Sequence, residues 1–418
     1  MRKKVWILNH YAGGMFFSEG GRHYNFAKYL KPAGYETVVF CANTKHGKAE
    51  KYFDTEKLWE EHQAENIGVP FIFVKARTYI GNGKQRILNM VDFYRNVQKT
   101  AKEYAKINGK PDIILASSVH PLTLVAGEKL AKHFGVKCIC EVRDLWPESI
   151  IVYSDKWKKS NPFIKLLYRG EKQIYKKADA VIFTMEGAYD YIAEQGWEKN
   201  IPREKVFFIN NGVDLEAFDY NKEHYKIDDP DLENPDIFKV VYAGSIRKAN
   251  NLGLLLDAAK KIKDPTVKFL IWGNGNEREA LEKRLKDENI HNVVFKGSVG
   301  KQYIPYIMSH AQLNLMNYPH EAAELYRFGS SQNKLFESMA SGVPTVCNVK
   351  IAHSLFERYH CGISINLNDA EQYADEILKM KNLSSDEYNE MSKNAKKGAA
   401  DYDFEKLTQK LIDIIEEV

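Results

Sequence analysis

The chain lacks long hydrophobic runs. None of its segments reaches the roughly eighteen consecutive apolar residues that a membrane-spanning helix needs. The N-terminus enters a strand-like run directly, and the apolar part of that run is too short for a signal peptide. The 418 residues are 44% apolar and 12% aromatic, a composition typical of a globular protein with about two domains.

Cysteine is also scarce, and the five cysteines indicate no disulfide framework. Cys138 and Cys140 alternate along a predicted strand, so their thiols share one face of it. We expect buried thiols rather than a metal site, because no further ligands accompany the pair. No other metal-binding cluster stands out, and we expect neither a metal ion nor a cofactor. This cysteine usage fits the reducing cytoplasm.

A dinucleotide-binding fingerprint is likewise missing. Gly20 and Gly21 follow the first predicted strand and precede a helix, but they lack the spacing G-x-G-x-x-G. Gly273 and Gly275 form a G-x-G, yet Arg278 stands where the third glycine is required. We therefore exclude a dehydrogenase. The glycines after the first strand either form a plain turn or let the backbone approach a ligand closely.

The small net charge of +4 hides an asymmetry between the two halves. Residues 1–200 contain 32 Lys and Arg against 22 Asp and Glu, whereas residues 201–418 contain 28 against 34. A basic half indicates an anionic partner, for which nucleic acid and an anionic membrane surface are both candidates. Ordinary solvated lysines would give the same count.

Short β-branched runs alternate with longer helical patterns, which is typical of a doubly wound parallel sheet. In the first half we expect strands at Val5–Leu8, Thr37–Cys41, Phe71–Val74, Ile113–Ala116, Cys138–Val142, Ala180–Phe183 and Val206–Ile209. The helices between them are expected at Gly21–Leu30, Ile87–Lys106, Leu122–Phe134 and Phe163–Lys177.

The same alternation restarts after the polar, proline-containing segment Asp219–Asp236, which we interpret as a linker or a surface excursion. The expected strands are Lys239–Tyr242, Val267–Trp272, Asn292–Phe295, Leu313–Met316 and Pro344–Cys347, with helices at Leu252–Ile262, Glu277–Glu288 and Asn333–Ala340. The sequence thus predicts an α/β protein with two Rossmann-like domains, 1–212 and 213–400. A last helix within 401–418 is expected to pack back onto the first domain. A ligand cleft should lie between the domains.

The segment Gly329–Pro344 carries the clearest indication of function. A small polar loop leads into a helix that contains Lys334 and Glu337 and stops at Gly342. Unpaired amides at a helix start attract anions. A carboxylate one turn further along is well placed to accept hydrogen bonds from sugar hydroxyls. Together these features favour a nucleotide-sugar site.

Several motifs in the same order resemble the retaining glycosyltransferases of family 4, in particular the bacterial enzymes of capsule, O-antigen and exopolysaccharide synthesis. They are Glu19-Gly-Gly21, Ser117-Ser-Val-His-Pro121, Glu141-Val-Arg-Asp-Leu-Trp-Pro-Glu-Ser149, Asn211-Gly-Val-Asp214, Tyr242-Ala-Gly-Ser245, Trp272-Gly-Asn-Gly275 and Gly329–Pro344. The resemblance implies the GT-B fold, which consists of two doubly wound domains facing a deep cleft.

The resemblance also implies which residues bind the donor. Arg247 and Lys334 would contact the donor diphosphate, with Lys248 as a weaker candidate, and Glu337 would bind the ribose hydroxyls. Eight residues before Glu337, where the family has a second glutamate, stands Gly329. The full set of implied donor-binding residues is Gly20, Gly21, Gly244, Arg247, Gly273, Ser330, Ser331, Asn333, Lys334 and Glu337.

On the acceptor side, Arg143 and Asp144 follow a predicted strand, and the Asp144 carboxylate could take or position the proton of the acceptor hydroxyl. His120 is the other catalytic candidate, although a lone histidine is often structural. Glu148 and Glu186 are candidates to line the same region. The resemblance implies catalysis without a metal ion, with the diphosphate charge offset by basic side chains and helix amides.

Two segments, Arg77–Met90 and Lys156–Arg169, interleave basic with large apolar residues. Such a pattern is found in helices of a membrane interface, and equally in core-packing helices with basic outer faces. With the basic first half, it favours a lipid-linked saccharide acceptor at the cytoplasmic face of an anionic membrane, and not nucleic acid. We expect a nucleotide-diphosphate sugar as donor, UDP-linked, with N-acetylated and deoxy sugars among the candidates. A sugar-nucleotide epimerase and a non-catalytic binder are the alternatives.

Overall fold

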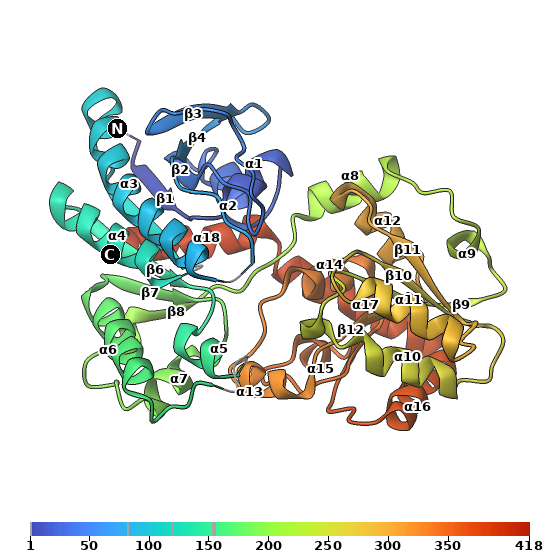
Figure 1. Cartoon of the computed structure of the whole chain (residues 1–418). Helices are drawn as coiled ribbons and strands as arrows, with labels where there is room; N and C mark the ends of the chain where they lie inside the picture. The colour runs from blue at the N-terminus through green and yellow to red at the C-terminus, as the bar shows by residue number, and fades with distance from the viewer. Residues whose placement is uncertain (1, 82, 119, 153–155) are drawn as a thin grey trace. The chain divides into compact units, whose positions relative to one another are not determined.

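The computed structural model describes residues 2–81, 83–118, 120–152 and 156–418, and these form two compact units (Figure 1). Unit 1 comprises the chain up to Asn210 together with Phe404–Val418. Unit 2 comprises Asn211–Asp403. The chain therefore passes from one unit to the other twice, and its last helix belongs to the unit in which the chain begins.

Unit 1 is built on an eight-stranded sheet with the order β3-β4-β2-β1-β5-β6-β7-β8. Each neighbouring pair is parallel except β3 and β4, which are antiparallel. Its strands are β1 Lys4–Leu8, β2 Glu36–Ala42, β3 Trp59–Ala64, β4 Val69–Val74, β5 Ile113–Ser117, β6 Lys137–Val142, β7 Ala180–Phe183 and β8 Val206–Phe208. The inner strands are almost entirely buried, as expected for a parallel sheet covered on both faces.

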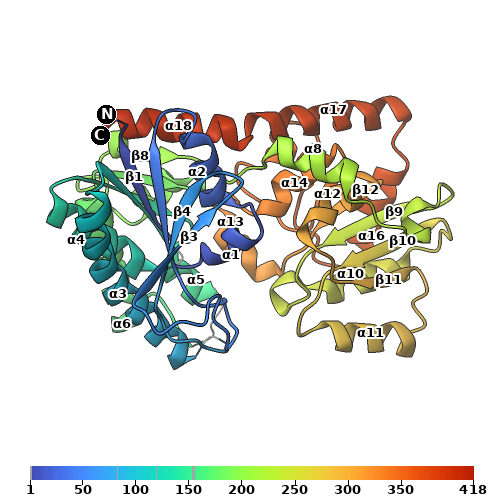
Figure 2. The same cartoon turned by 90° about the horizontal axis from the view of Figure 1, so that it is seen from above.

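Helices cover both faces of this sheet (Figure 2). The helices α3, α4 and α6 pack in a row on one face, and α2 packs against α18 on the other. The helices of unit 1 are α1 Gly13–Phe17, α2 Arg22–Leu30, α3 Lys84–Asn108, α4 Pro121–Phe134, α5 Trp146–Val152, α6 Pro162–Lys177, α7 Ala188–Glu194 and α18 Phe404–Glu417.

The C-terminal helix α18 buries one apolar face against unit 1. Leu407, Leu411 and Ile414 recur at helical spacing and are all at most 5% exposed. At the end of the helix, Glu416 accepts hydrogen bonds from Lys3 (2.6 Å) and from the Tyr35 hydroxyl (2.5 Å). Helix α18 thus joins the start of the chain to its end within one unit.

Unit 2 has a six-stranded parallel sheet with the order β11-β10-β9-β12-β13-β14. Helices α10, α11 and α16 cover one face, and α8, α12, α14 and α17 cover the other (Figure 2). The strands are β9 Phe238–Ala243, β10 Val267–Trp272, β11 Val293–Gly297, β12 Leu313–Met316, β13 Thr345–Cys347 and β14 Gly362–Ser364. The helices are α8 Leu215–His224, α9 Pro230–Glu233, α10 Leu252–Lys261, α11 Arg278–Asp287, α12 Ile304–Ser309, α13 Ala323–Tyr326, α14 Asn333–Ser341, α15 Leu355–Arg358, α16 Ala370–Lys381 and α17 Ser385–Asp401.

The segment Asp219–Asp236 is not a linker between the two units, because it lies within unit 2 and contains the end of α8 and all of α9. The acidic residues there have structural partners. Asp229 accepts hydrogen bonds from the first backbone amides of α9 and also pairs with Lys296 at 2.7 Å. Asp231 pairs with Lys296 and with Lys268. These ion pairs attach the segment to the edge strand β11 and to its neighbour β10.

The prediction of buried thiols is confirmed, since all five cysteines are free and buried. Cys138 and Cys140 lie on β6, in the middle of the unit 1 sheet. None of the helices in the described part of the chain is long and apolar enough to cross a membrane.

Candidate functional site

In unit 1, a buried carboxylate gathers residues from three elements at the carboxyl ends of the strands. Glu141, near the end of β6, accepts a hydrogen bond from Arg22 Nε at 2.6 Å and lies 2.9 Å from His23 Nε2. Ser117, the last residue of β5, donates to the same carboxylate at 2.7 Å. All four side chains are buried. The start of α2 is therefore fixed to the ends of β5 and β6.

The charge of Glu141 follows from these contacts. Burial would raise the pKa of the Glu141 carboxyl, but the Arg22 guanidinium and then His23 lower it well below its usual range. Burial lowers the pKa of His23, so its imidazole is neutral near pH 7. A neutral ring with its proton on Nε2 donates to Glu141 and leaves Nδ1 to accept from Asn9 Nδ2 at 3.0 Å. One ion pair, Arg22 with Glu141, is thus enclosed in a satisfied network.

The glycine pair lies directly before this network. Gly21 is the N-cap of α2 and has φ of 99°, a conformation that a residue with a Cβ rarely adopts. A Cβ at Gly21 would also lie 3.2 Å from the Met15 side chain in α1. Gly20 precedes it in the short loop between α1 and α2. The two glycines therefore open the helix that holds Arg22 and His23.

His120 is buried and faces another histidine. Its Nε2 lies 2.7 Å from His10 Nδ1, so one ring donates to the other. Burial lowers the pKa of His120 to about 3 and that of His10 well below its usual value. Both imidazoles are therefore neutral. The other ring nitrogen of His120 has no hydrogen-bond partner among the described residues.

Arg143 and Asp144 follow β6 and thus lie at the same edge of the sheet as His120, which follows the neighbouring strand β5. The backbone amide of Arg143 donates to Ser118 Oγ at 3.0 Å. The side chain of Arg143 is partly buried, and Asp144 is exposed. Of the three catalytic candidates, Asp144 is the most open to solvent.

Glu148 has a structural role that its sequence context does not indicate. It is buried in α5, accepts a hydrogen bond from the Tyr168 hydroxyl at 2.7 Å and pairs with Lys159 at 2.9 Å. These contacts connect α5 to α6. Glu186 lies in the loop after β7 and is partly buried.

In unit 2, the loops after β9 and β10 approach each other so closely that glycine is required. A Cβ at Gly273 would lie 1.7 Å from the carbonyl oxygen of Gly244, and one at Gly275 would lie 2.0 Å from that of Ile246. The Gly244 amide donates to Trp272 O at 3.0 Å, and the Gly273 amide donates to Gly297 O at 2.8 Å. These bonds extend the sheet register into the loops.

Two basic residues follow this glycine contact. Arg247 and Lys248 lie in the loop between β9 and α10, and both side chains are exposed. The Arg247 carbonyl accepts a backbone hydrogen bond from Asn250 at 2.8 Å, which fixes the loop. Its guanidinium can offer two parallel donors to an anion.

Lys334 lies in the first turn of α14, between two tyrosine rings. Its Nζ is 5.1 Å from the ring centroid of Tyr242, near the end of β9, and 5.1 Å from that of Tyr318, just after β12. Burial lowers the pKa of Lys334 to about 8, although Cys347 and Glu337 act against this shift. No described residue accepts a hydrogen bond from its ammonium or forms an ion pair with it.

Glu337 lies one turn further along α14 and is partly buried. Its carboxylate has no hydrogen bond or ion pair with any residue that the structure describes. Before the helix, Asn333 is exposed, Ser330 is buried, and the Ser331 carbonyl accepts from Asn211 Nδ2 at 2.5 Å. The loop that leads into α14 is therefore anchored by this hydrogen bond.

The glycine in place of the expected glutamate has a conformational reason. Gly329 has φ of 107°, a conformation in which a side chain is strained. A glutamate at this position would require a different loop before α14. The departure from the family pattern therefore changes the backbone conformation of the loop before α14, in addition to removing one carboxylate.

The structure thus brings the predicted residues into two groups. Gly20 and Gly21 join Arg143, Asp144 and His120 at the strand ends of unit 1, and Gly244, Gly273, Arg247, Lys334 and Glu337 lie at the strand ends of unit 2. That the two groups face one cleft stays a prediction. Arg22, His23 and Glu141 were missed by sequence reasoning, although a glutamate inside the apolar run of β6 was a signal for a buried ion pair. Within the described residues, no cluster of three or more His, Cys, Asp or Glu could hold a metal ion.

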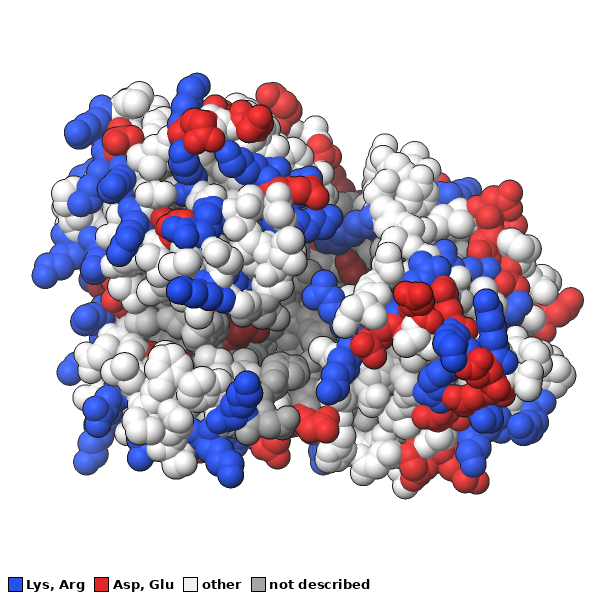
Figure 3. Space-filling model, in the orientation of Figure 1, with Lys and Arg blue, Asp and Glu red and all other residues white. Residues whose placement is uncertain are grey.

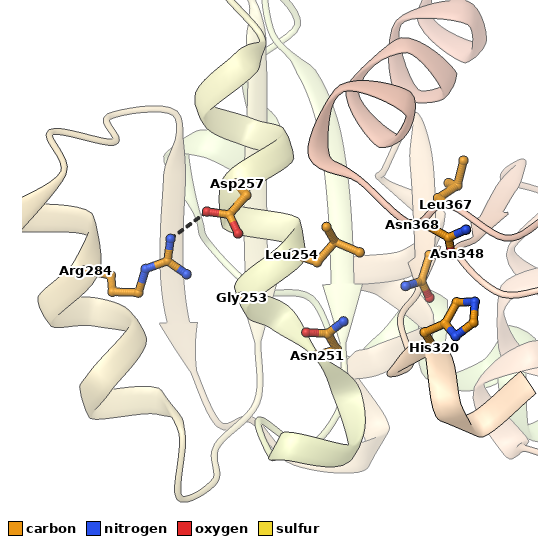
Figure 4. A pocket seen from close by; sticks show the side chains of 9 residues that line it. All are labelled: Asn251, Gly253, Leu254, Asp257, Arg284, His320, Asn348, Leu367 and Asn368. Atoms are coloured by element: carbon orange, nitrogen blue, oxygen red, sulfur yellow. Dashed lines mark hydrogen bonds and ion pairs between the residues drawn. The ribbon is translucent and has the colours of Figure 1, made fainter.

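A separate polar cavity of about 340 Å³ lies on the α10 side of unit 2 (Figure 4). Asn251, His320 and Asn348 lie at one end of it, and Arg284 and Asp257 form an ion pair of 2.6 Å at the other. Neither Lys334 nor Glu337 lines this cavity.

Comparisons with known proteins identify the family. Residues 22–217 match the family described as Glycosyltransferase Family 4, and residues 226–398 match Glycosyl transferases group 1. A curated relative is TuaH of Bacillus subtilis, named as a teichuronic acid biosynthesis glycosyltransferase, which is 24% identical over 212 residues, or 50% of this chain and 49% of TuaH. The chain spans about a third to a half of the length of the curated relatives that it matches.

Solved structures agree on the fold. Sucrose-phosphate synthase from Thermosynechococcus elongatus superposes with a TM-score of 0.74 at 17% identity, covering 100% of this chain and 99% of the other. HepE from Anabaena, solved in complex with UDP, superposes with a TM-score of 0.65 at 16% identity and covers 100% of both chains. Both are similar in fold to this protein, which has the GT-B fold. The two family matches cover nearly the whole chain, which belongs to glycosyltransferase family 4.

Proposed function

We propose that the protein is a retaining, metal-independent glycosyltransferase that moves a sugar from a nucleotide-diphosphate sugar to a lipid-linked saccharide. The observation that carries this proposal is the start of α14. There the side chains of Lys334 and Glu337 have no hydrogen-bonding partner among the described residues, and the N-cap residue Gln332 makes no side-chain hydrogen bond to the first amides of the helix, which would suit an anion. A cation, free amides and a free carboxylate together fit a sugar nucleotide.

The chemistry follows from where negative charge develops. When the bond between the sugar C1 and the diphosphate oxygen breaks, the diphosphate gains charge. Lys334, Arg247 and the amides of α14 would stabilise that charge without a metal ion. Glu337 would accept hydrogen bonds from the ribose hydroxyls. In unit 1, Asp144 is the exposed carboxylate that would position the acceptor hydroxyl, with Arg143 beside it.

The proposed donor is a UDP-sugar. Support comes from HepE, which shares the fold and is solved in complex with UDP and with UDP-glucose. Where the loops after β9 and β10 approach each other, the glycines leave only backbone groups, with no side chain to block a base. Gly329 stands where the family has a second glutamate, so contacts of the transferred sugar to a carboxylate at this position are replaced by contacts to the loop backbone.

The proposed acceptor lies on the cytoplasmic face of a membrane. Large apolar side chains are exposed in unit 1: Phe163 (49%) and Leu166 (62%) on α6, and Ile87 (58%) on α3. Lys and Arg dominate the face of unit 1 that Figure 3 displays, whereas both signs of charge are mixed over unit 2. Exposed apolar residues among basic ones fit an anionic membrane surface. The name of TuaH supports a role in surface polysaccharide synthesis.

A nucleotide-release assay tests the proposal. The purified full chain is incubated with a panel of nucleotide sugars and membrane-extracted acceptors, and the released nucleotide is measured. We expect release by the wild type and a loss of at least about a hundredfold in Glu337→Ala, on the order of an important transition-state or binding contact. Glu279→Ala on the exposed face of α11 is the matched control and should leave the rate unchanged.

The same assay distinguishes the alternatives. Turnover without acceptor to an isomeric sugar nucleotide would indicate an epimerase. Tight donor binding without transfer to any acceptor would indicate a non-catalytic binder. Full activity of Glu337→Ala would contradict the assignment of the donor site.

A further inference from the structure

The partly buried side chain of Lys334 is surrounded by aromatic rings instead of hydrogen-bond acceptors. The ammonium lies between the faces of Tyr242 and Tyr318, at 5.1 Å from each ring centroid. Each ring attracts the cation through its negative face. A ring, however, accepts no conventional hydrogen bond, and no described residue supplies one. The three N–H groups of the ammonium are therefore held among aromatic faces without an acceptor.

Both rings are fixed by contacts of their own. The Tyr242 hydroxyl donates to the Ser245 carbonyl at 2.9 Å, in the loop that contains Gly244. A Cβ at Gly244 would lie 3.0 Å from that hydroxyl, so a glycine there leaves room for it. The position of Tyr242 is thus linked to the loop that precedes Arg247.

Tyr318 is held from three sides. Its hydroxyl donates to Gln332 Oε1 at 2.6 Å, and the Gln332 amide donates in turn to the Tyr326 hydroxyl at 2.7 Å. Its backbone amide and carbonyl exchange hydrogen bonds with the Asn348 side chain at 2.8 and 2.9 Å. Gln332 is the residue directly before α14. The ring is therefore coupled to the start of the same helix that carries Lys334.

We propose that Tyr318 and Tyr242 are positioning residues that hold the Lys334 ammonium without an acceptor, so that the donor diphosphate supplies its first hydrogen bonds. This inference rests on the proposed function, since it concerns the same donor site. It assigns the two tyrosines a task that the family resemblance does not give them. Preorganisation of a long side chain removes the entropy that it would otherwise lose on binding.

A pH dependence follows from this geometry. The groups that face Lys334 are Tyr242 from β9, Tyr318 from the loop after β12, Cys347 from β13 and Glu337 from its own helix. Burial raises the pKa of the Cys347 thiol to about 12, so it stays neutral near pH 8, and burial raises the pKa of Tyr242 above its ordinary value. Lys334 is therefore the group of this set that titrates near pH 8.

The sign of the effect is set by the cation. A bound diphosphate favours the charged lysine and raises its pKa. Affinity for the diphosphate is therefore complete below about pH 8, the pKa of Lys334 without ligand, and falls by up to about tenfold per pH unit above it.

Calorimetric binding of UDP to the full chain between pH 7 and 9.5 tests the inference. In this range the terminal phosphate of UDP is ionised throughout. We expect the wild type and Tyr318→Phe, which keeps the ring, to share the midpoint near pH 8. In Tyr318→Leu the ammonium gains access to water, so the midpoint should move up by about one unit or more. Its affinity at pH 7 should fall about two- to tenfold.

The outcomes are separable. Identical pH profiles for wild type, Tyr318→Phe and Tyr318→Leu would overturn the inference while donor binding stands. Absence of UDP binding by the wild type at every pH would overturn the donor site itself. If Tyr318→Leu does not fold, the protons that the wild type takes up on binding UDP decide the question. Calorimetry at pH 8.5 in buffers of different ionisation enthalpy should show proton uptake, and absence of uptake would overturn the inference. Lys334→Met is the control in which this uptake should disappear.

Discussion

At the scale of single residues, the buried pair of Arg22 and Glu141 makes the sharpest prediction. Both side chains are at most 1% exposed, so removal of one charge leaves the other unpaired in the interior. Arg22→Met should lower the free energy of unfolding of unit 1 by about 3–5 kcal/mol. Urea unfolding followed by tryptophan fluorescence measures the change. Lys283→Met, which breaks a solvent-exposed pair on α11, is the control and should have no measurable effect.

The same pair shows where sequence reasoning stops. Arg22 and Glu141 are 119 residues apart, and nothing local to either residue indicates the other. Lys334 and Glu337, by contrast, could be predicted as donor-binding residues from sequence, because that prediction depends on one short segment, a polar loop that opens an amphipathic helix. His120 was recognised as a candidate, but its partner His10 was not, since the two meet only when β1 and β5 pair.

At the scale of elements, the contact between the loops after β9 and β10 predicts a strong effect of a single methyl group. Gly273→Ala places a Cβ 1.7 Å from the Gly244 carbonyl oxygen and imposes a φ of 141° on alanine. The loops must separate, and we expect UDP binding to weaken at least about tenfold. Gly170→Ala on α6, where nothing lies within 4 Å of the new Cβ, is the control. It should keep UDP binding and raise the stability by about 0.5–1 kcal/mol. Equal UDP affinity of Gly273→Ala and wild type would contradict the account of this contact.

Most strands and long helices could be predicted from periodicity, because buried parallel strands are continuous apolar runs and the helices have one apolar face. Strand β3 was missed because it is an edge strand with Glu60, Glu61 and His62 among its six residues, so it lacks the apolar signal. Helix α8 was not predicted, because much of it lies in a polar segment without a clear apolar periodicity. Its start is fixed by the Asp214 side chain, which accepts from the Ala217 amide at 3.2 Å.

At the scale of the whole molecule, the asymmetric charge predicts how the chain meets a membrane. Residues 1–200 contain ten more Lys and Arg than Asp and Glu. We expect the protein to sediment with vesicles that contain anionic lipid, and to be released when the salt concentration is raised from 0.05 to about 0.5 M, because the charges are then screened. Phe163→Ser combined with Leu166→Ser should weaken binding further at every salt concentration. Equal binding to neutral and anionic vesicles would contradict this prediction.

The most direct test of the central claim is the product itself. The wild-type chain is incubated with UDP-sugars and a membrane-extracted lipid-linked saccharide, and the lipid product is analysed by mass spectrometry and by NMR of its new anomeric proton. We expect a mass gain of one sugar residue, the anomeric configuration of the donor, and unchanged yield in the presence of EDTA. An inverted configuration, a requirement for metal, or sugar transfer by Glu337→Ala at the wild-type rate would contradict it.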